Sequence, residues 1–172
     1  MPIAVTQAFI TAGTALSNGT AYVLAENVTM TTPFTFEGDG SGVTFDGSGH
    51  TITLPLYWAG LFSKAVTVSN LGVLSTGSTL IGAGWFFASG VGGTATNCYS
   101  TGRINQSGGG IFGNRSNGTA TDCYSTGEID SDAGGIFGYN SRGSATACYS
   151  TCLLYTSPSP RDRTRSRMPS SA

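Results

Sequence analysis

Charged residues are scarce in this chain. Asp, Glu, Lys and Arg make up only 10% of the 172 residues, and the sequence contains one lysine and one histidine. No apolar run approaches the ~20 residues that a membrane-spanning helix needs. The first residues also lack the basic and apolar segments of a signal peptide. These absences predict a protein without membrane insertion.

The few basic residues are unevenly placed. Four of the eight lie in residues 152–172, beside a single acid: Arg161, Arg163, Arg165 and Arg167. The rest of the chain then has four basic and eight acidic residues, a net charge of −4. A mildly acidic body lacks the basic patch that binds phosphates, so we expect no nucleic-acid partner.

Glycine, by contrast, is abundant, with 26 residues, and Ser, Thr and Asn interrupt every apolar run. This excludes long amphipathic helices. Short pieces rich in β-branched and aromatic residues remain, separated by Gly, Asn and Ser turns. The composition therefore predicts an all-β chain.

An internal repeat of 25 residues is the main signal. Cys-Tyr-Ser-Thr recurs at Cys98, Cys123 and Cys148, and Ile111-Phe112 recurs as Ile136-Phe137. Phe86-Phe87 and Leu61-Phe62 extend the repeat towards the N-terminus, and we align Val73 with Cys98. At ~3.3 Å per residue, 25 residues trace one closed turn of ~80 Å. Stacked turns of this length predict a β-solenoid, a β-helix with rungs of about 25 residues.

The repeat divides the chain into four regions. We expect an N-terminal cap in 1–21, irregular first turns in 22–57, and regular rungs in 58–151. Residues 152–172 match no position of the repeat, and Cys152 stands where the pattern requires glycine. This segment resembles a translated sequencing adapter, which implies a non-native, disordered tail on a truncated fragment. We expect further rungs after Thr151 in the natural protein, and self-association through a bare sheet edge.

The alternation of side chains along a strand assigns faces to the repeated residues. Two ladders are expected in the core, formed by Cys98, Cys123 and Cys148 and by Phe62, Phe87, Phe112 and Phe137. Thr96 lies two residues before Cys98 and should also point inward. Tyr99, Tyr124 and Tyr149 have the opposite parity and should form an outward aromatic ladder, with Leu74 below it.

Several segments in order resemble a known family. They are YVLAENVTM, FDGSGHTITL, AGLF, VSNLGV and GGIFGYNSRGSATACYSTG, within residues 22–151. This order resembles the GLUG-motif β-helical proteins, although Ile-Phe replaces Leu-Val and cysteine replaces the usual serine. The resemblance implies a right-handed parallel β-helix in large adhesin-like proteins of cell or virion surfaces, and it carries over no catalytic residue.

Residues with catalytic or metal-binding chemistry show no convincing arrangement. The three core cysteines have no CxxC spacing and no partnering histidine, so we expect free thiols, no metal and no cofactor. His50, the one histidine, has no nucleophile motif beside it. A calcium-binding loop at residues 130–135 is another hypothesis, but its only support is the presence of carboxylates in a short loop. A carbohydrate-active enzyme is the main alternative, and it would need Glu37, Asp39 and Asp46 to converge.

Two repeated ladders suggest binding functions. The tyrosine ladder could stack on sugar rings or simply pack on itself. The Thr-x-Thr pattern at Thr94–Thr96 and Thr119–Thr121 is typical of ice-binding proteins, but the inward position expected for Thr96 argues against that function. We therefore predict a non-enzymatic, extracellular repeat module of a surface protein, with glycans or other surface components, or copies of itself, as partners.

Overall fold

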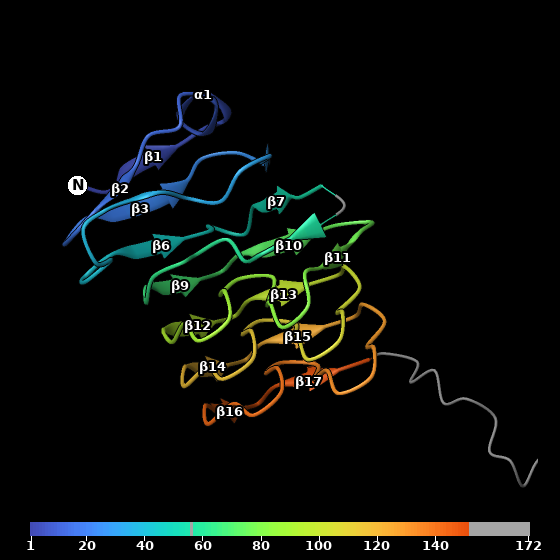
Figure 1. Ribbon diagram of the computed structural model, residues 1–172. Coiled ribbons are helices and arrows are strands. Elements are labelled where there is room, and N and C mark those ends of the chain that lie inside the picture. The colour runs from blue at the N-terminus through green and yellow to red at the C-terminus, as the bar shows by residue number, and fades with distance from the viewer. Residues whose placement is uncertain (56, 152–172) are drawn as a thin grey trace, which may run out of the picture.

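The computed structural model describes residues 1–55 and 57–151; the tail predicted for 152–172 lies outside the described residues. The fold prediction is confirmed, because the chain is a β-solenoid of parallel sheets (Figure 1). One helix, α1 (Gln7–Thr11), occurs in the described part. The described helices include none long and apolar enough to cross a membrane.

Two long parallel sheets form two sides of the solenoid. The seven-stranded sheet contains, in order, β1 (Ile3–Val5), β3 (Ala21–Leu24), β6 (Thr44–Asp46), β9 (Thr67–Ser69), β12 (Thr94–Thr96), β14 (Thr119–Thr121) and β16 (Ser144–Thr146). The six-stranded sheet contains β4 (Val28–Thr29), β7 (Thr51–Thr53), β10 (Gly72–Leu74), β13 (Tyr99–Ser100), β15 (Tyr124–Ser125) and β17 (Tyr149–Ser150).

Two short strand pairs and a series of bridges complete the turns. β2 (Leu16–Ser17) pairs with β5 (Phe36–Glu37), and β8 (Tyr57–Trp58) pairs with β11 (Ser78–Thr79). On the remaining side, isolated parallel bridges join the phenylalanine ladder from Phe62 to Phe137. The rungs are thus held together along the whole axis by backbone hydrogen bonds.

Rung length varies more than the sequence repeat suggests. The paired inward residues of the seven-stranded sheet are Tyr22, Phe45, Val68, Ala95, Ala120 and Ala145. The step from Val68 to Ala95 is longer than the steps on either side of it. This long rung shifts the register of the cysteine column. Leu71, not Val73, lies beside Cys98, because Gly72 pairs with Tyr99.

Each regular rung turns at three residues with left-handed backbone. The corner between β12 and β13 is Asn97 (φ 52°), and its equivalents are Asn70, Asp122 and Ala147. The other two corners are Ser107 and Arg115 in this rung, with Asp132 and Asn140 one rung later. Asn, Asp and Gly adopt this conformation at least cost, and the Asn97 amide also donates to the Asn70 amide oxygen at 2.9 Å.

The first corner reverses the alternation of faces, so one expectation from the sequence is wrong. Ala95 is fully buried and Thr94 and Thr96 flank it on the outer face. Asn97 then turns the chain, and Cys98 points inward again. Thr96 was expected inside because simple alternation was carried through a residue that does not have strand geometry.

Stacked aromatic side chains fill much of the core. Phe112 is fully buried and its ring lies parallel to that of Phe87, at 4.5 Å between centroids, and to that of Phe137, at 4.8 Å. Phe137, in the last described rung, is half-buried. At the other end, Phe9 and Ile10 of α1 pack against the core. Residues 1–21, expected to be a cap, therefore supply a covering helix and also the edge strand β1.

The corner can be tested with two substitutions of Asn97. Both Asn97→Gly and Asn97→Val remove the amide hydrogen bond to Asn70, but only valine is strained at φ 52°. We expect Asn97→Val to lower the free energy of unfolding by about 1–3 kcal/mol more than Asn97→Gly. Urea unfolding followed by circular dichroism measures this difference, and equal stability of the two variants would contradict the assigned corner.

Candidate functional site

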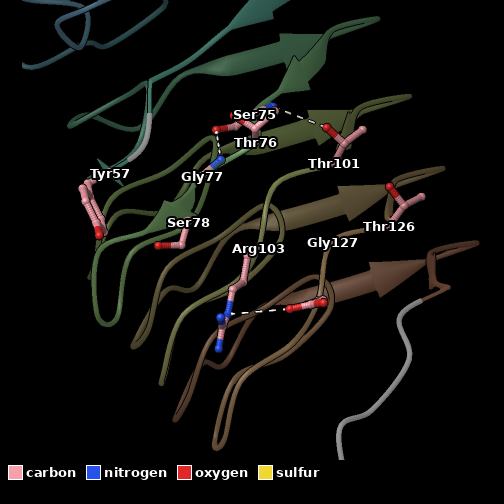
Figure 2. Close-up of a pocket in the computed structure, with 10 residues that line it drawn as sticks. Tyr57, Ser75, Thr76, Gly77, Ser78, Thr101, Arg103, Thr126 and Gly127 are labelled. Carbon is pink, nitrogen blue, oxygen red and sulfur yellow. Dashed lines mark hydrogen bonds and ion pairs between the residues drawn. The ribbon is translucent and has the colours of Figure 1, made fainter.

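A groove of about 620 Å³ runs along one edge of the solenoid. Its walls come from successive rungs, with Tyr57 of β8 on one side and Thr101 and Thr126 on the other (Figure 2). Ser78 and Arg103 continue the Tyr57 side on the following rungs. The groove thus lies between the β8–β11 side and the six-stranded sheet.

Backbone register fixes the spacing of the first wall. Ser78 pairs with Tyr57 and also bridges to Arg103. The next rung places Glu128 beside Arg103, because the Ile104 amide donates to the Glu128 carbonyl oxygen at 2.7 Å. At about 4.8 Å per rung, this column of four residues is about 14 Å long.

Two of the residues that line the groove are glycines, Gly77 and Gly127. Gly77, Gly102 and Gly127 occupy equivalent places, since the Arg103 amide donates to the Gly77 carbonyl oxygen and Gly127 lies against the Gly102 carbonyl. A Cβ on Gly102 would overlap the buried Trp85 ring, whose Nε1 donates to the Gly102 carbonyl oxygen at 3.0 Å. A side chain at Gly102 would therefore collide with the core.

The charges in the groove are paired. The Arg103 guanidinium lies 3.3 Å from an Asp130 carboxylate oxygen and 4.0 Å from one of Glu128. Arg103 and Glu128 are 25 residues apart and form a cross-rung pair between equivalent positions of the repeat. Because both partners are largely exposed, the pair adds little stability. It leaves one cation beside two carboxylates, so the groove has no excess positive charge.

Tyr57 is the exposed aromatic side chain of the groove. It is 70% exposed, and no aromatic ring of the described residues stacks on it. Both faces of a free tyrosine ring can pack against another flat or apolar group. The sequence analysis did not single out Tyr57. The signal was present in the Tyr-Trp pair of β8, where alternation buries Trp58 and exposes its neighbour.

The predicted tyrosine ladder is present as a stacked column on the outer face. The rings of Tyr99 and Tyr124 are 5.0 Å apart and nearly parallel, and those of Tyr124 and Tyr149 are 5.2 Å apart. Burial, with the adjacent tyrosines, raises the pKa of Tyr124. Gly72, not Leu74, lies below Tyr99, whose ring occupies the space that a Cβ at Gly72 would need. Within the ladder the rings cover one another's faces, which leaves mainly edges for a ligand.

The cysteine ladder lies in the core. Cys98 and Cys123 are fully buried, Cys148 is half-buried, and all three are free thiols. The Cys98 thiol contacts the Thr96 carbonyl oxygen at 3.3 Å, and that of Cys123 contacts the Thr121 carbonyl oxygen at 3.2 Å. A hydrogen bond with Cys123 and burial raise the pKa of Cys98, and burial raises that of Cys148. These thiols are placed as packing groups.

The acidic residues considered for catalysis have partners in the local turns. Asp39 accepts from the Ser41 amide at 2.9 Å, which with further hydrogen bonds lowers its pKa. Asp46 accepts from the Ser48 amide and the Asn70 side chain, and Glu37 accepts from the Ser17 hydroxyl. Among the described residues, no group of three or more His, Cys, Asp or Glu side chains could hold a metal ion. His50 is half-buried just before β7.

A second exposed surface is formed by the outer face of the seven-stranded sheet. Its two columns are Thr44, Thr67, Thr94, Thr119 and Ser144, and Asp46, Ser69, Thr96, Thr121 and Thr146. The Thr94, Thr96, Thr119 and Thr121 hydroxyls make no hydrogen bond to another described residue. Over β3, β6 and β9 the face is hollowed by a depression of about 430 Å³. The regular hydroxyl array therefore belongs to β12, β14 and β16.

Comparisons with known proteins add no assignment. The chain matches no protein-family model, and neither a curated protein nor a solved structure matches it. The groove and the hydroxyl face thus have to be interpreted from their own geometry.

The burial of the thiols can be tested by their reactivity. In a Cys152→Ser variant, we expect Cys98 and Cys123 to react with a disulfide reagent orders of magnitude more slowly in the folded protein than in denaturant. Fast labelling of Cys98 and Cys123 at neutral pH would contradict their place in the core.

The stability of the protein should also depend on pH through Cys98. Its raised pKa means that the folded state holds this proton to higher pH than the unfolded state. The free energy of unfolding should therefore fall as the pH rises above the ordinary thiol pKa of about 8.5.

Proposed function

We propose that this chain is a non-enzymatic β-solenoid module of an extracellular, adhesin-like protein at a cell or virion surface, and that it binds glycan in the groove. The supporting observation is the unstacked, 70% exposed ring of Tyr57 opposite a row of threonine hydroxyls. Aromatic platforms with nearby polar groups suit sugars, which present both apolar C–H faces and hydroxyls. The resemblance to GLUG-motif proteins fits the same proposal.

A carbohydrate-active enzyme on this scaffold is the main alternative. Glycoside hydrolases canonically use two carboxyl groups on either side of the scissile bond, one of them held protonated. Glu128 and Asp130 instead both contact one side chain, Arg103, and are occupied as its partners. Hydrogen bonds lower the pKa of Asp39, which opposes a role as the protonated acid. These contacts support a binding role.

Glycan binding can be tested with the exposed tyrosines. We expect the chain to be retarded in affinity electrophoresis by at least one soluble polysaccharide, without release of reducing sugar. Tyr57→Ala should weaken retention roughly tenfold, because it removes the platform. Tyr139→Ala is the matched control, since Tyr139 is 58% exposed but lies outside the groove. An equal loss of retention in both variants would argue against glycan binding in the groove. Release of reducing sugar would favour the carbohydrate-active enzyme.

Ice binding is a second candidate, favoured by the outward position of Thr94, Thr96, Thr119 and Thr121. The objection drawn from the sequence was that Thr96 points inward, and the structure removes it. The hydroxyls repeat at about 4.8 Å between rungs and at twice the ~3.3 Å strand rise along each strand. Such a fixed array could hold water in an ordered layer.

A measurement of thermal hysteresis tests whether the hydroxyl face of the seven-stranded sheet binds ice. If the hydroxyl face binds ice, a gap between melting and freezing temperatures appears and is lost in Thr96→Lys and Thr121→Lys. Thr53→Lys, on the outer face of the other long sheet, should leave it unchanged. No gap in the wild-type chain would reject ice binding and leave the glycan proposal intact.

A further inference from the structure

The groove is elongated in one direction, and this restricts the class of ligand that it can bind. Its first wall is the column Tyr57, Ser78, Arg103 and Glu128, and register places one residue on each of four successive rungs. The opposite wall contains Thr101 and Thr126, which are also one rung apart. Both walls therefore run along the solenoid axis, not across it.

The rung spacing is close to the length of one pyranose unit in an extended glycan. Each rung adds about 4.8 Å, so a chain lying along the axis would meet a new set of side chains at about each sugar. Gly77 and Gly127 line this path without a side chain. A glycan crossing the groove would instead meet the two walls within one rung.

The charges select against acidic sugars. Among the described residues that line the groove, Arg103 is the one basic residue, and it lies within ion-pairing distance of both Glu128 and Asp130. A uronate or sulfate would have to displace a carboxylate from the guanidinium and would face the other. Neutral hydroxyls can donate to Glu128 and accept from Arg103 without breaking the pair.

We infer that the groove binds an extended neutral oligosaccharide of about four units, lying parallel to the solenoid axis, with one end stacked on Tyr57 and the other hydrogen-bonded at Glu128. The inference rests on the proposed glycan-binding function and specifies its ligand. Affinity arises from a ring contact at one end and from hydroxyl contacts with Thr101, Thr126 and Glu128 along the chain.

Isothermal titration with defined oligosaccharides tests the inference on the full chain. The probes are cello-, xylo-, manno- and chito-oligosaccharides of one to six units, and oligogalacturonates of the same lengths. For at least one neutral series, affinity should rise up to about four units and then level off, while oligogalacturonates of equal length bind at least tenfold more weakly.

Two variants locate the ends of the ligand. Tyr57→Ala should lower the affinity for short and long oligosaccharides alike, by roughly tenfold. Glu128→Ala should leave monomers and dimers unaffected but reduce the affinity for tetramers to nearly that of dimers. Tyr139→Ala, outside the groove, should change neither.

The outcomes separate this inference from the proposed function. Affinity independent of length, a preference for oligogalacturonates, or equal effects of Glu128→Ala on dimers and tetramers would overturn the axial neutral ligand but leave glycan binding in place. Binding that is unchanged in Tyr57→Ala would place the site outside the groove. If no oligosaccharide of the panel binds, both the inference and the proposed function fail.

Discussion

The left-handed corner residue is the constraint on which the rest of this solenoid depends. Each rung closes only if the chain turns sharply, and Asn97, Asp122 and their equivalents make that turn within a single residue. The turn also resets which side chains point inward, so it places Ala95 and Cys98 in the core and Thr96 outside. The hydroxyl face and the cysteine column therefore have the same origin. The Asn and Asp corners cost little free energy because these residues tolerate positive φ, and a hydrogen bond between the Asn97 and Asn70 side chains supports two of them between rungs.

The regular recurrence of the Cys-Tyr-Ser-Thr and Ile-Phe elements is strong enough to predict the fold class, because identical positions in stacked rungs must meet. It predicts the phenylalanine ladder equally well, since Phe62, Phe87, Phe112 and Phe137 keep a constant spacing. The prediction from the repeat fails where the spacing between equivalent residues of successive rungs changes. The longer rung between Val68 and Ala95 moves Leu71 beside Cys98, and a fixed period could not show this. Recurring Asn and Asp before the Cys-Tyr pair were the available signal for a corner.

The 25-residue repeat could not predict the groove, because irregular rungs form it. Its walls come from rungs of unequal length, and the step from Tyr57 to Ser78, its neighbour on the next rung, is shorter than the repeat. Nothing in an alignment of fixed period brings these two together. The repeat does bring Arg103 and Glu128 together, because they are 25 residues apart. A repeat thus predicts contacts between equivalent residues, whereas irregular rungs create the features that distinguish one solenoid from another.

The two sets of exposed tyrosines show why position alone does not identify a binding residue. Tyr99, Tyr124 and Tyr149 recur and face outward, yet their rings lie 5.0 and 5.2 Å apart and nearly parallel. The faces of these rings are therefore covered by their neighbours in the ladder. Tyr57 does not recur, and its ring has no aromatic partner among the described residues. Repetition favours self-stacking because every rung offers the same neighbour at the same distance. A ligand gains most from a side chain that the scaffold leaves unpaired, and an irregular rung is where such a side chain arises.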